Sequence, residues 1–230
     1  MSDREALKQA AGEHAASWIE SGMVVGLGTG STAIHAINRI AARLVDGSLT
    51  QVIGIPTSRA SEMVATELGI QLGNLADYPV IDITIDGADE VDPDFNLIKG
   101  GGAALLHEKV VAQASLREVI VVDAEKCSEM LGAKFAVPVE VLAFAWRPEA
   151  DYLDDMGAEV RLRRDAGSDP VVTDEGNWIL DATFGPIADV ERLSTSLDRR
   201  AGVVAHGLFL GLATDLVVAG PNGIEHRTSP

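Results

Sequence analysis

The sequence predicts an α/β protein with a Rossmann-like parallel-sheet domain and a second, smaller ferredoxin-like α+β domain. In the first half of the chain, short apolar runs alternate with amphipathic segments of helical period. This alternation is typical of βαβ units and a parallel sheet. Glycine-rich and acidic loops follow the apolar runs, at the edge where open α/β sheets bind ligands. Beyond residue 132 the order becomes strand, helix, two strands, helix and strand, as in the ferredoxin-like arrangement.

The first half supplies the alternating elements of the parallel sheet. Residues 3–21 are predicted to form a helix, with Ser2 or Asp3 as its cap. Further helices are expected over 32–45, 58–68 and the later part of 100–114, and strands over 23–28, 51–56, 78–86 and 117–124. The strand 78–86 is indicated by isoleucines that alternate with polar residues.

The second half supplies the smaller domain. Strands are expected over 137–143, 158–163 and 202–209, helices over 148–156 and 187–198, and a hairpin over 171–183 that turns at Asp174 to Asn177. A last apolar strand, 214–220, is expected to rejoin the first sheet. We therefore expect a catalytic domain made of 1–132 and 207–230, and a smaller domain made of 133–206.

Composition and charge exclude several classes of protein. With 35 acidic residues against 18 basic ones, the chain has no basic stripe for nucleic acid. No apolar run reaches the length of about 18 residues that a membrane helix needs, and the N-terminal segment lacks the apolar core of a secretion signal. The single cysteine, Cys127, favours a reducing cytoplasm. The net charge of −17, with only five lysines, fits either adaptation to high salt or simple solubility.

The segment "GLGTGST", residues 26–32, lies between a predicted strand and a predicted helix. Its glycines allow a tight turn in which successive N–H groups face one anion, and Thr29, Ser31 and Thr32 add hydroxyl donors. Neither the dinucleotide pattern nor the Walker pattern fits, because Ser31 occupies the third glycine position and no G-K-[ST] follows. A small phosphate monoester fits better. The alternative is a tight turn with a capping serine.

The segment "KGGGAALLHEK", residues 99–109, is more specific. Three successive glycines cost backbone entropy, and their N–H groups are suited to an oxyanion site beside the positive charge of Lys99. Glu108 follows on a helix, flanked by apolar residues, and is expected to be partly buried. Burial disfavours the charged form of a carboxylate and makes it a better general base near neutrality. A flexible loop and an exposed glutamate are the alternatives.

Other patterns are given no chemistry. His107 lies on the helix face opposite Lys109 and is interpreted as a core histidine, while Cys127 has no evident histidine partner. No cluster of His, Cys or Glu has zinc spacing, and the acidic segment 86–94 does not match an EF-hand loop. No metal site is therefore predicted.

Taken in order, five segments resemble the motifs of type A ribose-5-phosphate isomerases: "GLGTGST", "IPTSRAS", "DGADEVD", "KGGGAALLHEK" and "VVDAEKCSEMLGAKFAVPVEV". The resemblance extends to "VVTDEGNWILD" and covers essentially the whole chain. It implies an aldose–ketose isomerase of the pentose phosphate pathway that interconverts D-ribose 5-phosphate and D-ribulose 5-phosphate. It also implies that no metal or organic cofactor takes part, and that the chain forms a homodimer or homotetramer.

The resemblance also implies a role for each matching residue. Glu108 takes the place of the proton-transferring base, and Asp86, Asp89 and Lys99 handle ring opening and the enediolate. The substrate contacts fall on Thr29, Gly30, Ser31, Thr32, Gly87, Ala88, Gly100, Gly101, Gly102, Lys126 and Lys8. The remaining acidic residues of the same segment, Glu90, Asp92 and Asp94, are expected on the solvated surface.

Three other functions fit parts of the sequence. A phosphosugar sensor would need a DNA-binding module, which is not visible, and would not need Glu108. A nicotinamide-dependent dehydrogenase would have glycine in place of Ser31 and an acidic residue after the second strand, where "PTSR" occurs. A related sugar-phosphate reaction, such as deamination of an amino sugar, stays open.

Overall fold

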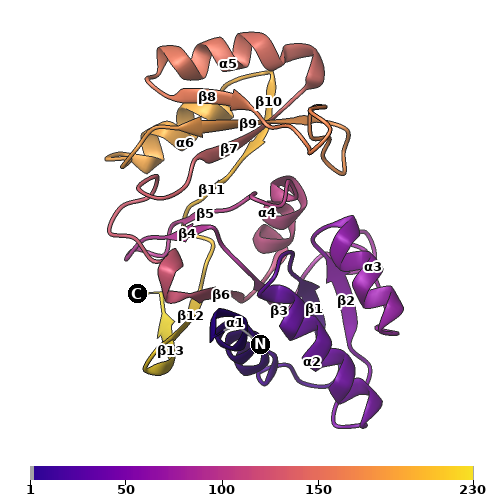
Figure 1. Cartoon of the computed structure of the whole chain (residues 1–230). Coiled ribbons are helices and arrows are strands. Elements are labelled where there is room, and N and C mark those ends of the chain that lie inside the picture. Colours follow the sequence, from indigo (N-terminus) through magenta and orange to yellow (C-terminus); the bar gives the residue numbers. More distant parts are fainter. Residues whose placement is uncertain (1–2, 230) are drawn as a thin grey trace. The chain divides into compact units, whose positions relative to one another are not determined.

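The computed structural model describes residues 3–229 and divides into two compact units (Figure 1). Ser2 lies outside the described residues, so its expected role as a helix cap is not tested. The first unit comprises residues 1–88, 107–126 and 211–230, and the second comprises 89–106 and 127–210. This division places 89–106 with the smaller unit, unlike the expected boundaries at 132/133 and 206/207. The division by contacts does not test independent folding, so the expected domains 1–132 with 207–230, and 133–206, stay a prediction.

The first unit contains a six-stranded sheet of order β13-β12-β6-β3-β1-β2, parallel except for β13 at one edge. The strands are β1 (Val24–Leu27), β2 (Ile53–Pro56), β3 (Ile83–Asp86), β6 (Glu118–Asp123), β12 (Asp215–Gly220) and β13 (Gly223–Thr228). β12 pairs in parallel with β6, which confirms that the last apolar strand rejoins the first sheet. The predicted Rossmann-like sheet is therefore present, with an antiparallel edge strand that the sequence analysis did not identify.

Helices cover both faces of this sheet because its strand residues alternate between two apolar cores. Val25 and Leu27 pack into the core that also contains residues of α1 and α2, whereas Ile55 packs with Val111 of α4 on the other side. The helices are α1 (Asp3–Ala16), α2 (Ala33–Val45), α3 (Arg59–Glu67) and α4 (Leu105–Ala114). None of the helices among residues 3–229 is long and apolar enough to cross a bilayer.

The second unit has the predicted ferredoxin-like order of elements. Its four-stranded antiparallel sheet, β10-β7-β9-β8, carries both helices on one apolar core. The elements are β7 (Val137–Val141), α5 (Trp146–Asp155), β8 (Glu159–Leu162), β9 (Trp178–Thr183), α6 (Val190–Asp198) and β10 (Val203–His206). A second sheet of order β11-β5-β4 contains β4 (Glu90–Val91), β5 (Leu97–Ile98) and β11 (Leu208–Phe209).

The predicted strand 202–209 is wrong as a single element, because the chain changes sheet at Gly207. β10 pairs with β7 and β11 pairs with β5. Gly207 donates its N–H to the Pro138 carbonyl and accepts the Lys99 N–H at its own carbonyl, so its backbone connects the two sheets. A Cβ at Gly207 would lie 2.3 Å from the Lys99 carbonyl oxygen, so only glycine fits there.

A polar cluster at the start of β12 holds elements of the first unit together. Asp215 accepts hydrogen bonds from Arg117 at 2.7 and 2.8 Å, from Thr214 at 2.8 Å, and lies 2.7 Å from His226 Nε2. The Arg117 guanidinium also lies 4.4 Å from the Trp18 ring. Burial raises the pKa of Asp215, but the hydrogen bonds from Arg117, His226 and Thr214 outweigh it and lower that pKa to about 2.

Asp215→Asn is expected to lower the melting temperature at pH 7 by roughly 2–10 °C, because hydrogen bonds to a charged group contribute about 1.5–3 kcal/mol each. The pKa of Asp215 is lower in the folded chain than the unfolded value of about 3.9, so this stabilisation is complete above about pH 4. It is lost as the pH falls toward 2. Melting curves from pH 2 to 7 measure the effect. The control is Glu225→Gln, which removes the exposed ion pair between Glu225 and Arg227. Equal melting temperatures for Asp215→Asn and wild type at pH 7 would contradict the assignment.

Candidate active site

The predicted site residues are divided between the two units. The first unit holds Lys8, Thr29, Gly30, Ser31, Thr32, Asp86, Gly87, Ala88, Glu108 and Lys126, and the second holds Asp89, Lys99, Gly100, Gly101 and Gly102. Within the first unit, β1, β2, β3 and β6 run in parallel, so the loops that follow them leave the same edge of the sheet. This is the arrangement that the sequence analysis expected.

Asp86 anchors the glycine loop that follows β1. The side chain is fully buried, and its Oδ1 accepts the Thr29 N–H at 2.9 Å and the Gly87 N–H at 2.7 Å. Gly28 permits this contact, because a Cβ there would lie 2.5 Å from Asp86 Oδ1. The carboxylate therefore fixes the direction of the loop, in addition to any contact with a ligand.

The loop ends at a helix start that suits an anion. The first residue before α2 is Thr32, whose side chain makes no capping hydrogen bond, and the first turn of α2 contains no acidic residue. Ser31 is not the cap; its Oγ instead accepts a hydrogen bond from Lys8 Nζ at 2.9 Å. The alternative of a capping serine is therefore not supported. Lys8 adds positive charge beside the N–H groups of a helix terminus, where a phosphate is stabilised.

Two hydroxyl groups adjoin this loop that the sequence analysis gave no role. Thr29 Oγ1 lies 2.7 Å from Thr57 Oγ1 and 2.7 Å from Ser58 Oγ, and both partners are buried. Both residues follow β2 in the segment "IPTSRAS". Residues directly after a parallel strand commonly line a ligand site, so this position could have identified them as site residues from the sequence. Ser58 also caps α3, accepting the Ser61 N–H.

Glu108 and Lys126 both belong to the first unit. Glu108 lies in α4 and is only 6% exposed, so the alternative of an exposed helix glutamate is wrong. Lys126 ends a short 3₁₀ helix, η1 (Ala124–Lys126), which begins directly after β6. Its side chain is half-buried. A buried carboxylate is suited to proton transfer, and a lysine near a strand end is suited to phosphate binding.

In the second unit, Asp89 and Lys99 flank the three-glycine segment. Asp89 Oδ2 accepts the Gly101 N–H at 2.7 Å. Lys99 is only 2% exposed, and its Nζ lies 5.5 Å from the centroid of the Phe209 ring. An ammonium against an aromatic face is held by the ring quadrupole. The segment is therefore anchored, and the alternative of a flexible surface loop is not supported.

One acidic residue was placed wrongly by the sequence analysis. Glu90 was expected on the solvated surface, but it is fully buried and accepts the N–H groups of Gly132, Lys134 and Phe135 at 2.9 to 3.3 Å. It holds a turn of the second unit. Asp92 accepts the Asp94 and Asn96 N–H groups within its own turn.

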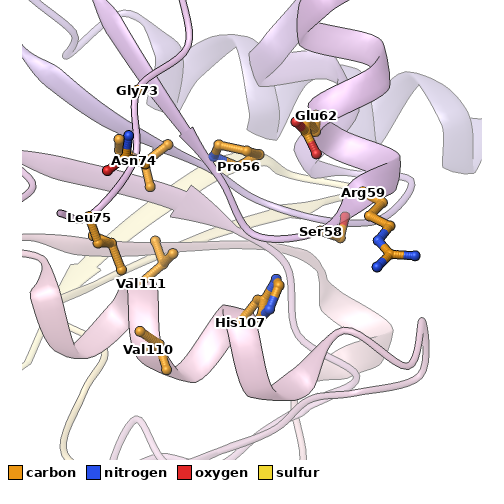
Figure 2. Close-up of a pocket in the computed structure, with 11 residues that line it drawn as sticks. Pro56, Ser58, Arg59, Glu62, Gly73, Asn74, Leu75, His107, Val110 and Val111 are labelled. Atoms are coloured by element: carbon orange, nitrogen blue, oxygen red, sulfur yellow. The ribbon is translucent and has the colours of Figure 1, made fainter. Parts of the chain in front are cut away.

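The first unit also contains an open pocket of about 480 Å³ between α4, the start of α3 and segment 73–75 (Figure 2). Its lining includes Arg59, Asn74, His107 and Val110, and it contains none of the predicted site residues. His107 is half-buried and faces this pocket, so its interpretation as a core histidine is wrong.

Comparison with known proteins identifies relatives over the full length of the chain. The family model described as ribose 5-phosphate isomerase A (phosphoriboisomerase A) matches residues 53–223. The ribose-5-phosphate isomerase A of Desulfatibacillum aliphaticivorans is 52% identical over 225 residues, which cover 98% of each chain. That of Chloroflexus aurantiacus is 51% identical over 98% of this chain and 94% of the relative.

Solved structures give the same result. A D-ribose-5-phosphate isomerase in complex with phospho-erythronic acid superposes with a TM-score of 0.96 at 36% identity, over 98% of this chain and 99% of the other. The ribose 5-phosphate isomerase A of Methanocaldococcus jannaschii gives a TM-score of 0.93 at 38% identity, over 97% of this chain and 99% of the other.

Proposed function

This chain belongs to the ribose 5-phosphate isomerase A family and is therefore an aldose–ketose isomerase of ribose 5-phosphate, and we propose that it works through an enediolate with Glu108 as the general base. The observation that carries the proposal is the burial of Glu108, a carboxylate 6% exposed in the first turns of α4. A general base for a carbon acid needs such a carboxylate, shielded from bulk water.

The proposed reaction conserves every atom of the sugar phosphate. After ring opening, the Glu108 carboxylate takes the C2 proton, the C–H electron pair forms the C1–C2 double bond, and the carbonyl pair moves onto O1. A proton then passes from the O2 hydroxyl to O1. The electron pair left on O2 forms the new carbonyl as C1 takes the proton back from Glu108. The product is ribulose 5-phosphate, and no oxidant, reductant or metal is required.

The other residues divide the remaining tasks. Lys99 and the N–H groups of Gly100 and Gly102 stabilise the negative charge on O1, while the Gly101 N–H holds Asp89. Asp86 and Asp89 hold sugar hydroxyls during ring opening, while Gly87 and Ala88 contact the sugar through their backbone. The phosphate is held by the loop of Thr29 to Thr32, by Lys8 and by Lys126. Phospho-erythronic acid, whose carboxylate resembles the enediolate oxygens, is expected to bind this chain as a competitive inhibitor.

The assay for the proposal is ketose formation from ribose 5-phosphate, in buffer that contains EDTA. Steady isomerisation that EDTA leaves unchanged supports a metal-free mechanism. A loss of activity that added zinc, magnesium or manganese restores would contradict it. The homodimer or homotetramer, the cytoplasmic location and the place in the pentose phosphate pathway remain part of the proposal, and light scattering of the purified chain tests the first of these.

Lys126→Ala is expected to raise KM for ribose 5-phosphate about 10-fold or more and to change kcat by less than about threefold. A contact with the phosphate is present in both the ground state and the transition state, so its loss weakens both equally. Steady-state kinetics measure the two constants separately. Lys109→Ala, a half-buried lysine of α4, is the control. A lower kcat with unchanged KM would instead assign Lys126 to the chemical step.

A further inference from the structure

One guanidinium nitrogen of Arg163 holds two successive carbonyl groups of the three-glycine segment. Arg163 Nη1 donates to the Gly100 carbonyl at 2.7 Å and to the Gly101 carbonyl at 3.1 Å. All of these groups belong to the second unit, although more than sixty residues separate them along the chain. Neither the motifs nor the family resemblance assigned a role to Arg163.

Arg163 is itself held firmly by the sheet of the second unit. It follows β8 directly, and its N–H donates to the Ile179 carbonyl of β9 at 2.8 Å. Its Nε and Nη2 donate to the two carboxylate oxygens of Asp181 at 2.9 and 2.5 Å. The side chain is 17% exposed. This two-point contact with a carboxylate leaves Nη1 pointing in one fixed direction, toward the glycines.

The two accepted hydrogen bonds determine where the following N–H groups point. In a trans peptide unit the carbonyl and the next N–H point in opposite directions. The Gly101 and Gly102 N–H groups are therefore turned away from Arg163. The Gly101 N–H donates to Asp89 Oδ2 at 2.7 Å, which agrees with this geometry.

A glycine segment needs such hydrogen bonds to hold its backbone in one conformation, because glycine is the most flexible residue. Gly100 has a φ of +106°, which side-chain-bearing residues rarely adopt, and a Cβ at Gly101 would lie 2.8 Å from Asp89 Oδ1. The positions of Gly100 and Gly101 therefore favour glycine, which has the largest backbone freedom to lose. Donors that stabilise a developing oxyanion must be oriented before the reaction, since reorientation during it would cost free energy.

We propose that Arg163, supported by Asp181, is a positioning residue for the isomerase reaction: it fixes the Gly100–Gly102 segment so that the Gly101 N–H holds Asp89 and the Gly102 N–H faces the oxygen that becomes anionic. Arg163 does not touch the substrate and acts through the glycines alone. The inference rests on the proposed enediolate mechanism and assigns an orienting group to it.

The test compares Arg163→Met with Arg161→Met. Arg161 lies on the same sheet, two residues earlier, but its side chain is 77% exposed and pairs with the exposed Glu159. Arg163→Met is expected to lower kcat about 10- to 100-fold, the range for misplaced catalytic groups, and to change KM less than about threefold. Arg161→Met is expected to keep both constants within about twofold of wild type.

A second readout separates positioning from a general loss of structure. Arg163→Met is expected to raise the inhibition constant of phospho-erythronic acid by about the same factor as it lowers kcat, because both depend on the oriented donors. Inorganic phosphate should inhibit with an unchanged constant. If Arg163→Met does not fold, Arg163→Lys and Asp181→Asn replace it, since each disrupts the two-point contact and keeps most of the side-chain volume.

The outcomes distinguish the inference from the function on which it rests. If wild type and Arg161→Met both lack isomerase activity, the proposed function fails. If both are active and Arg163→Met, Arg163→Lys and Asp181→Asn match them in kcat and in inhibition by phospho-erythronic acid, the positioning role is overturned. A rise of the inhibition constant for inorganic phosphate equal to that for phospho-erythronic acid would also overturn it.

Discussion

Glu108→Gln is expected to lower kcat by at least about 10²-fold and to leave KM within about threefold of wild type. The amide keeps the size and shape of the carboxylate but cannot accept the C2 proton, so the loss falls on the chemical step. Glu108 is 6% exposed, so bulk water has little access to its carboxylate. Steady-state rates of ketose formation measure kcat, and exchange of the C2 hydrogen with deuterated water measures proton abstraction directly.

The matched control is Glu149→Gln. Glu149 is another helical, buried glutamate, 4% exposed in α5, and its carboxylate accepts hydrogen bonds from Arg200 at 2.8 and 3.2 Å. Its amide variant should lower the melting temperature because it weakens this pair, and should leave kcat unchanged. If Glu108→Gln exchanges the C2 hydrogen at a rate near that of wild type, Glu108 is not the base.

Lys99→Ala is expected to lower kcat by about 10²- to 10³-fold, with a much smaller change in KM. Negative charge on the substrate oxygen develops only after binding, so a cation that stabilises it acts mainly on the transition state. Lys99 is suited to this role because it is 2% exposed, and charge interactions are stronger where water is excluded. Kinetics with ribose 5-phosphate separate the two constants.

Lys134→Ala is the control for this variant. Lys134 belongs to the same unit but is exposed, and its Nζ donates to the Cys127 carbonyl at 2.5 Å. Its removal should leave both constants within about twofold of wild type. If Lys99→Ala raises KM and leaves kcat normal, Lys99 contributes to substrate binding in the ground state. The role proposed for Lys126 would then belong to Lys99.

The fold of the first unit was largely predictable because its signals are local. Apolar runs with helical segments between them indicate a parallel sheet, and the right-handed βαβ connection leaves few other topologies. The loops after β1 and β3 were located for the same reason, since each follows its strand directly in the chain. The sequence could not show that Asp86 turns back to accept the Thr29 N–H, because that contact joins residues far apart in the chain.

Glu90 illustrates where the prediction failed. It lies among five acidic residues in nine, and such a run is typically solvated. The structure buries it because three N–H groups of the turn at Gly132 to Phe135 converge on its carboxylate and replace water. Its neighbour Asp94 remains exposed, as expected. Two carboxylates of the same acidic segment, Glu90 and Asp94, thus have different environments.

The sequence by itself determined the family, the order of most strands and helices, and the identity of the candidate catalytic groups, because these depend on motifs and periodicities within short segments. Only the tertiary structure decided that Gly207 divides one apolar run between two sheets, that Lys8 reaches Ser31, and that Arg163 bonds to two carbonyls of the glycine segment. Each of these depends on a hydrogen bond or a close approach between residues distant in the chain. Local propensity carries no information about such a partner, since the partner is brought near only when the sheets and helices pack.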